Sequence, residues 1–178
     1  MSSKKSAQAE PVVEIHPLLA PIYFELDQLY AAAKIEADGY WRDLDRHQKK
    51  YKNRVETWWK HSVRVRKARV TDGRSLSIEW SYNIFVGEKG ERRPISKYIK
   101  RGHTPKYPQS RFARAMDNEL VRIMEAEELF GPIRQRADCL HKARRHILAY
   151  LKHEGMAPYD EIEIKSRART SSDSSEAI

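Results

Sequence analysis

The chain has 178 residues and is strongly basic, with 34 Lys and Arg against 25 Asp and Glu and a formal net charge of +9 at pH 7. This length predicts one domain, and the charge favours a polyanionic partner, with nucleic acid ahead of a membrane surface. The single cysteine, Cys139, excludes a disulfide framework and a Cys-rich zinc site, and its place on an apolar stripe predicts a core residue. No apolar run is long enough for a transmembrane helix, and the N-terminus lacks the apolar region of a secretory signal, so we expect a cytoplasmic protein.

The two ends of the chain lack apolar patterning. Residues 1–14 are small and polar, and residues 156–178 are rich in serine and charge, so both segments are predicted to be disordered. The folded part is predicted to be a single α+β domain over residues 15–155.

The first predicted element is a long amphipathic helix. It begins at Pro17 or Pro21, because proline is tolerated in the first turn of a helix, and it ends near Lys60. Apolar and aromatic residues recur at spacings of three and four: Ile22, Leu26, Leu29, Ala33, Ala37, Tyr40, Leu44, His47, Tyr51, Val55 and Trp58. Such a helix is about 60 Å long. It therefore packs either on the C-terminal helices or on a second copy of the chain, unless Gly39 breaks it.

A three-stranded antiparallel sheet is predicted over residues 62–70, 75–86 and 93–100. The second strand has the clearest pattern, because β-favouring apolar residues occupy alternate positions. They are Leu76, Ile78, Trp80, Tyr82, Ile84 and Val86. Asp72-Gly73 and the stretch from Gly87 to Gly90 indicate the two turns. Glu79 is expected to pair with an arginine of the first strand.

Two further helices are predicted after the sheet. The first begins near Pro108 and has an exposed acidic face that includes Glu119 and Glu127. Gly131-Pro132 is expected to end it, since glycine often terminates a helix and proline often starts one. The last helix then runs to Gly155. The predicted order is α-β-β-β-α-α, in which the long N-terminal helix and the two C-terminal helices pack on one face of the sheet.

Basic residues are concentrated on the first strand and in the loop after the third. The loop has no acidic residue between positions 92 and 116, and Tyr98, His103 and Tyr107 alternate with its cations. Cations with interleaved rings are typical of surfaces that contact phosphates and pack on sugars or bases. The candidate DNA-binding residues are Arg64, Arg66, Lys67, Arg69, Lys97, Tyr98, Lys100, Arg101, Lys106, Tyr107, Arg111 and Arg114. The alternative is a solvated strand edge and a rigid surface loop in a basic protein that is merely soluble.

No pattern in the sequence indicates catalysis. There is no Gly-rich phosphate loop and no HExxH or paired-histidine metal spacing, and His141 and His146 fall on different faces of one helix. A tyrosine nucleophile at Tyr98 or Tyr107 lacks the histidine cluster that common relaxases need. A nuclease built on Glu79 lacks converging acids to hold Mg²⁺. We therefore expect no enzyme activity, no metal site and no cofactor.

Several short segments together resemble a known family. They are Ser77-Ile78-Glu79-Trp80, Ser96-Lys97-Tyr98-Ile99, the basic loop to Tyr107-Pro108, the Glu-rich helix from Glu119 to Glu128, and Pro132-Ile133-Arg134. Over about residues 40–150 the chain resembles MobI-like conjugative transfer proteins, which are encoded by integrative conjugative elements and related plasmids. The resemblance implies an auxiliary mobilisation factor that acts at the origin of transfer with the relaxase. Such a factor helps to assemble the relaxosome without cutting DNA.

Charge and resemblance agree in predicting a protein that binds double-stranded DNA at the origin of transfer and contacts a relaxase or another relaxosome protein. One alternative is a protein-interaction adaptor that acts through the first helix and has only nonspecific affinity for nucleic acid. A weaker alternative is an RNA-binding protein. A homodimer through the first helix, the sequence of the DNA site and the cations that read bases stay open.

Overall fold

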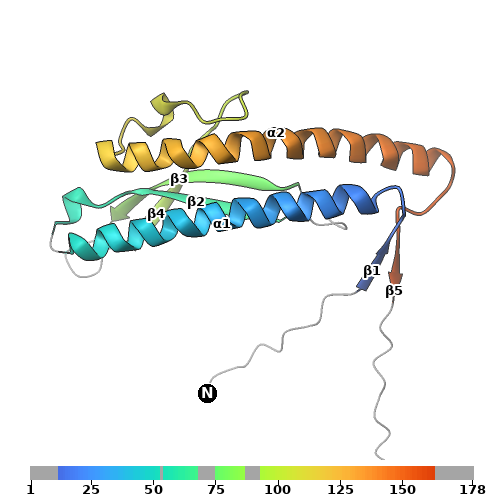
Figure 1. The fold of residues 1–178 in the computed structure, drawn as a ribbon, viewed down its shortest axis with the longest axis horizontal. Helices are drawn as coiled ribbons and strands as arrows, with labels where there is room; N and C mark the ends of the chain where they lie inside the picture. Colours follow the sequence, from blue (N-terminus) through green and yellow to red (C-terminus); the bar gives the residue numbers. More distant parts are fainter. Residues whose placement is uncertain (1–11, 53, 68–74, 87–92, 163–178) are drawn as a thin grey trace, which may run out of the picture.

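The protein has an α+β fold in which two long helices accompany a three-stranded antiparallel sheet. The structure, a computed structural model, describes residues 12–52, 54–67, 75–86 and 93–162. Helices α1 (Ala20–Lys50) and α2 (Asp117–His153) lie side by side and run in opposite directions (Figure 1). The sheet lies along one half of this helix pair, which we call the sheet half. In the other half the two antiparallel helices pack on each other without the sheet, and we call it the hairpin half although no loop joins the helices there.

The sheet confirms the three predicted antiparallel strands. Its order is β2 (His61–Arg66), β3 (Ser77–Val86) and β4 (Arg93–Tyr98). Val63 faces Trp80 across the first pair, and Ile84 faces Ile95 across the second. The strands differ from the predicted ranges by a few residues at their ends. The predicted turns at residues 72–73 and 87–90 lie outside the described residues.

The alternating apolar residues of β3 are buried at one end of the strand only. Ile78 and Trp80 are buried, whereas Val86 is 51% exposed. The ring of Trp80 contacts Tyr40 of α1 and Phe130 of α2, so both helices lie on the Trp80 face of the sheet. The helices therefore cover β3 up to Trp80 and leave the far end of the sheet accessible.

Helix α1 also covers the outer edge of β2. The hydroxyl of Tyr40 donates to the carbonyl of His61 at 3.2 Å, and the indole of Trp41 donates to the carbonyl of Val63 at 2.9 Å. These bonds use carbonyls that would otherwise form an open edge for pairing with another strand. Gly39 does not break the helix.

Helix α1 ends at Lys50, so the predicted end near Lys60 is wrong. The indole of Trp58 donates to the carbonyl of Tyr51 at 3.0 Å. Carbonyls at a helix end have no helical partner, and this bond supplies one. A single 3₁₀ turn (Val55–Thr57) lies between the two aromatic residues. Trp58 continues the helical spacing in the sequence, yet in the fold it closes the helix.

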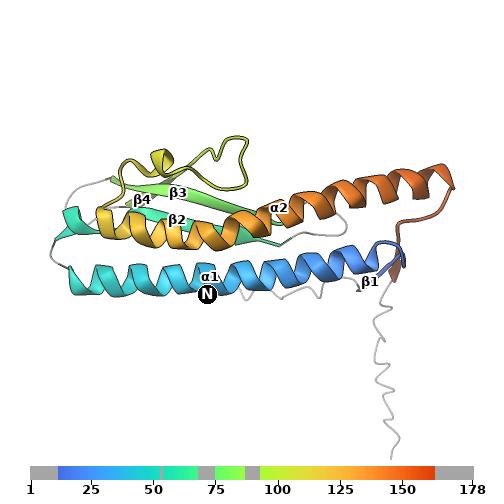
Figure 2. The ribbon, with the colours of Figure 1, turned by 45° about the horizontal axis from the view of Figure 1, so that its top comes forward.

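Helix α2 is continuous, so the predicted break at Gly131-Pro132 and the third helix are wrong. Pro132 lies inside the helix, where it removes a backbone hydrogen bond. The helix changes direction near its middle, as is usual at an internal proline (Figure 2). It continues because Phe130 and Arg134, on either side of the proline, are both buried against the rest of the fold. The observed order of the main elements is α-β-β-β-α.

The hairpin half has an apolar core of its own. It comprises Leu19, Ile22, Tyr23, Leu26, Leu29, Leu76, Ala137 and Leu151. Leu76, directly before β3, joins this core to the sheet. Cys139 was expected in the core but is exposed, because the buried stripe of α2 passes through Ala137 and Leu151 instead.

The two ends of the described chain form a short pair of strands. Strand β1 (Val12–Ile15) pairs antiparallel with β5 (Tyr159–Ile162) at the end of the hairpin farthest from the sheet (Figure 1). Both strands lie largely within the segments predicted to be disordered. Residues 1–11 and 163–178 lie outside the described part of the chain.

Candidate nucleic-acid interface

Three of the four cations predicted on the first strand are paired with a carboxylate. Arg64 and Arg66 place a guanidinium nitrogen 3.3 and 3.5 Å from the same oxygen of Glu79. The ammonium of Lys67 lies 3.1 Å from the carboxylate of Asp27 on α1. The expected pairing of Glu79 is thereby confirmed, and Arg69 lies outside the described residues. Charge on β2 is thus largely compensated by its neighbours.

The cations in the loop after the sheet differ from those on β2, because most of them have no acidic partner. In the part of the chain that the structure describes, no carboxylate pairs with five of them: Lys97, Lys100, Arg101, Arg111 and Arg114. We call these residues, together with Tyr98, the β4-loop surface. Lys106 is excluded from it because its ammonium lies 2.5 Å from Glu128. The structure therefore divides one sequence-predicted set into compensated and uncompensated charges.

The two tyrosines predicted at this interface have opposite surroundings. Tyr98 is 59% exposed, whereas Tyr107 is only 1% exposed. Burial raises the pKa of Tyr107 well above its ordinary value, and a hydrogen bond with Tyr98 adds to the rise. Tyr107, a predicted DNA contact, packs its ring on Phe112 in the interior, so Tyr98 is the accessible one of the two tyrosines.

A buried ion pair in α2 fixes the position of this loop. The carboxylate of Glu127 accepts two hydrogen bonds from the guanidinium of Arg134, each 2.8 Å long. The same carboxylate accepts the indole N–H of Trp80 at 2.6 Å and the backbone N–H of Tyr107 at 2.8 Å. Arg134 also donates to the carbonyl of Pro105 at 3.0 Å. The pair thus ties α2, β3 and the loop together.

Extensive hydrogen bonding makes this ion pair tolerable inside the protein. Glu127 is 0% and Arg134 4% exposed, and a buried charge is costly unless its hydrogen bonds are satisfied. The guanidinium of Arg134 also lies over the ring of Tyr107, 4.9 Å from its centre. A network with this many fixed directions specifies a single arrangement of the loop.

A second buried carboxylate fixes the start of α2 against the sheet. One oxygen of Glu119 accepts the backbone N–H groups of Lys60 and His61, both at 2.7 Å, and lies 3.0 Å from the imidazole of His61. The other oxygen accepts the N–H of Met116 at 3.3 Å and caps the helix. Glu119 and Glu127, both expected on an exposed acidic face, are therefore internal.

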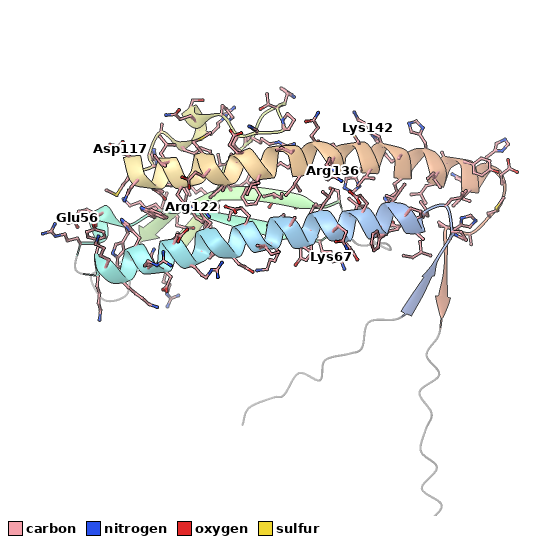
Figure 3. The ribbon with its side chains drawn as sticks, in the orientation of Figure 1. Glu56, Lys67, Asp117, Arg122, Arg136 and Lys142 are labelled. Atoms are coloured by element: carbon pink, nitrogen blue, oxygen red, sulfur yellow. The ribbon has the colours of Figure 1, made fainter. Side chains whose placement is uncertain are left out.

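The two helices are joined by a partly buried cluster of charges. Arg122 reaches from α2 towards α1, where it bonds Glu36 at 2.7 Å and Asp43 at 2.9 Å (Figure 3). Burial opposes the charge, but these hydrogen bonds outweigh it and raise the pKa of Arg122. The sheet half of the molecule is thus held by polar as well as apolar contacts.

The β4-loop surface extends from the end of β4, opposite the middle of β3, into the loop that follows. The guanidinium of Arg114 lies 5.4 Å from the ring centre of Tyr82, the residue that faces Lys97 across β3 and β4. Arg111 approaches the backbone of Gly102, whose φ of 97° turns the chain between Arg101 and His103. The uncompensated cations therefore come from both ends of the loop.

The opposite face of the sheet carries a row of small polar groups. Ser62 and Ser81 share a hydrogen bond of 2.8 Å, the amide of Asn83 donates to Ser62 at 3.1 Å, and Ser96 donates to Asn83 at 2.5 Å. The row crosses all three strands. Hydroxyl and amide groups of this kind can pair with base edges in a groove of DNA.

Sequence reasoning missed the residues that position the interface. The spacing of Glu127 and Arg134 is the only sequence signal for their ion pair, because two residues seven positions apart lie on the same face of a helix, separated by two turns. That signal is hidden by the Gly131-Pro132 pair between them. Glu119 lies three residues after Met116, the N-cap residue of α2, which is the spacing of a capping box.

The described residues hold neither a candidate metal site nor a candidate membrane span. No group of three or more His, Cys, Asp or Glu side chains there is placed to hold a metal ion. No helix there is long and apolar enough to cross a membrane.

Comparison with known proteins gives a family but no close relative. No curated protein and no solved structure matches the chain. A family model described as MobI protein matches residues 29–148, which include most of α1, the sheet, the basic loop and most of α2. The chain therefore belongs to the MobI family, and this membership implies a role in conjugative mobilisation.

Proposed function

We propose that the protein is a DNA-binding accessory factor of conjugative transfer, which recognises the origin of transfer and helps to assemble the relaxosome without cutting DNA. One observation carries the proposal: five cations of the β4-loop surface have no carboxylate partner in the described part of the chain. Phosphate groups are natural partners for such cations, because their binding releases counterions from DNA.

The rigidity of the loop supports this proposal. Glu127 and Arg134 hold its backbone at Pro105 and Tyr107, so the cations around it are placed before DNA arrives. Preorganised contacts lose less conformational entropy on binding than contacts that must be ordered. Tyr98 adds an exposed ring that can pack on a sugar or a base.

Recognition of a particular sequence requires contacts with base edges. We assign these to the outer face of the sheet, where Ser81, Asn83 and Ser96 lie between Arg64 and the β4-loop surface. Arg64 and Arg66 reach DNA in this proposal only by exchanging Glu79 for phosphate or guanine, so their contribution is smaller than that of free cations.

The expected protein partners are inferred from membership of the family and not from a particular surface of the structure. A mobilisation role makes a relaxase or another relaxosome protein the expected partner of the DNA-bound form. We propose that the chain acts there as an assembly factor and carries out no reaction of its own.

A mobility shift at about 150 mM salt tests DNA recognition. Duplex from the transfer region of the element should stay bound in the presence of excess scrambled competitor. Changing Lys100 and Arg101 to Ala should weaken binding and lower the slope of log K against log salt by up to about 2. Changing Arg136 and Lys142 to Ala is the matched control, because it removes the same charge from the hairpin half (Figure 3). Equal losses in both variants would contradict a localised interface.

A second candidate function is a protein-interaction adaptor. Phe24 and Ile35 are 67% and 71% exposed on α1, a surface that a partner or a second copy of the chain can cover. An adaptor should not retard duplex DNA specifically, and serine at both positions should abolish partner binding. Competition with RNA of matched length separates DNA binding from RNA binding.

A further inference from the structure

A pocket lies beside the beginning of β3, where β4 no longer accompanies it. β4 pairs with β3 only as far as Ser81, which faces Tyr98. The pocket has a volume of about 430 Å³, within the range of about 300–1,000 Å³ that small-molecule sites occupy. Its walls are the β3 segment around Ile78, the turn from Lys100 to His103, and two residues of α2, Arg134 and Asp138.

The rim of this pocket combines positive charge with planar rings. Lys100 and Arg101 line it and belong to the uncompensated cations. The carboxylate of Glu79 also lines it and is paired with Arg64 and Arg66. Tyr98 and His103 line it as well, and both side chains are exposed. Such a rim suits a ligand that has a negative group and a flat ring, which describes a nucleotide.

The lining of the pocket includes a buried cation with a spare donor, Arg134. A guanidinium has five N–H groups. Four hydrogen bonds of Arg134 reach Ile78, Pro105 and Glu127, and in the described part of the chain the fifth N–H has no partner. A base oxygen or a phosphate oxygen can accept it. Asp138, at the wall, is an acceptor for the amino group of a base.

We propose that this pocket takes one unpaired nucleotide of the bound DNA. The base enters beside Tyr98 and His103, and its phosphate stays at the rim with Lys100 and Arg101. A paired nucleotide cannot enter, because its base is stacked on both faces and its edge is occupied. The protein therefore selects DNA with an unpaired position over perfect duplex, an inference that rests on the proposed DNA binding.

An extended peptide is the competing occupant, because the pocket continues the sheet where a strand is missing. The rim argues against it. Peptide addition uses backbone hydrogen bonds and needs neither free cations nor exposed rings. The nucleotide uses all three features of the pocket, namely the rim charge, the rim rings and the spare N–H of Arg134.

The test measures binding of the full chain to two labelled duplexes by fluorescence anisotropy. One duplex is perfectly paired, and the other carries a single unpaired thymidine at its centre. We expect about tenfold tighter binding of the second, since stacking of one base typically gives this much. Tyr98→Leu and His103→Ala, tested separately, should each reduce the preference. Arg111→Ala, outside the pocket, should weaken both complexes and leave their ratio unchanged.

The outcomes separate this inference from the proposed function. Binding of both duplexes with equal affinity would overturn the nucleotide pocket, leave the gap beside β3 to a peptide, and keep DNA binding. A preference that neither Tyr98→Leu nor His103→Ala reduces would place the selection elsewhere and also overturn it. Failure to bind either duplex would overturn the proposed function itself.

Discussion

The two halves of the molecule are stabilised in different ways. In the sheet half, Glu119, Glu127 and Arg134 are buried, and each makes several hydrogen bonds to other elements. In the hairpin half, α1 and α2 are held by an apolar core, and their ion pair between Arg136 and Glu25 is largely exposed. Buried polar networks thus lie where loops and strands must be placed. Where the two helices only pair, apolar contact predominates and is supplemented by a part-buried hydrogen bond from Arg144 to the hydroxyl of Tyr23.

This difference has a consequence for binding. A buried network fixes directions as well as distances, whereas an apolar helix contact tolerates small shifts. The uncompensated cations adjoin the sheet half, whose geometry is fixed. The basic residues of the hairpin half, such as Lys142 and Arg145, lie on a more adaptable support. We therefore expect substitutions that loosen the sheet half to change both stability and DNA affinity.

Glu127→Ala should have the largest effect of the changes considered. It leaves Arg134 buried without its partner, and breaking a buried ion pair in this way typically costs about 3–5 kcal/mol of unfolding free energy. Urea denaturation measures the loss. The neighbouring Glu128→Ala is the matched control, since Glu128 is 67% exposed and its pair with Lys106 is worth about 0–1 kcal/mol.

A double variant separates the effect of losing the charges from the effect of losing side-chain volume. Changing Glu127 and Arg134 together to Met removes both charges and keeps most of the volume, and such replacements are often neutral or stabilising. Stability should therefore recover in part relative to Glu127→Ala, because the buried charge is gone while the groups that bonded to the pair still lack partners. DNA affinity should not recover, because Pro105 and Tyr107 lose their polar anchors. Equal stability of the single and double variants would contradict this account.

Arg122→Met and Arg136→Met compare the cross-helix ion pairs of the two halves. The Arg122 side chain is 17% exposed and bonds two carboxylates, so its loss should cost about 1.5–3 kcal/mol. The Arg136 side chain is 64% exposed, and its loss should cost about 0–1 kcal/mol. Urea midpoints of the two variants give the comparison. An Arg136 variant as unstable as the Arg122 variant would show that the hairpin also depends on its charges.

Much of the fold could be predicted from local patterns. Period-two alternation from Leu76 to Val86 located the central strand, and spacings of three and four located α1. Gly131-Pro132 misled because a local rule was overridden by tertiary contacts: Glu127 and Arg134 bind across it and keep the helix continuous. Trp58 led to a predicted helix that is too long, because its position fits the helical spacing. In the structure its indole instead donates to the carbonyl of Tyr51 at the helix end.

The sequence predicted which segment is rich in basic residues, but it did not predict which of these residues are exposed and without an acidic partner. The absence of acids from residues 92–116 identified the basic loop. It could not show that Lys106 is compensated by Glu128, because that partner comes from a distant part of the chain. It could not separate Tyr98 from Tyr107 either, since burial of the second depends on Phe112 and Arg134. Partners across a strand pair, such as Glu79 for Arg64, were within reach of the sequence.

The smallest predicted effect concerns one histidine in each half. Burial lowers the pKa of His47, in the sheet half, and of His141, in the hairpin half, where Arg144 adds to the lowering. Nδ1 of His47 and Nε2 of His141 are buried and have no hydrogen-bond partner in the described part of the chain. In His47, Nε2 accepts the amide N–H of Asn118 at 3.3 Å, so protonation there would set two donors against each other. In His141, protonation of Nε2 would leave an unsatisfied charged N–H.

The sign of the pH effect follows from linkage. Each imidazole has a lower pKa in the folded protein than the ordinary value of about 6.5 in the unfolded chain. The unfolded chain therefore binds more protons, so stability is greatest above pH 6.5 and falls as the pH drops towards the folded pKa. His47→Gln and His141→Gln should each reduce the drop in Tm between pH 7 and pH 5. If only His47→Gln does so, the hairpin half opens readily enough to protonate His141 without unfolding, which would strengthen the contrast between the two halves.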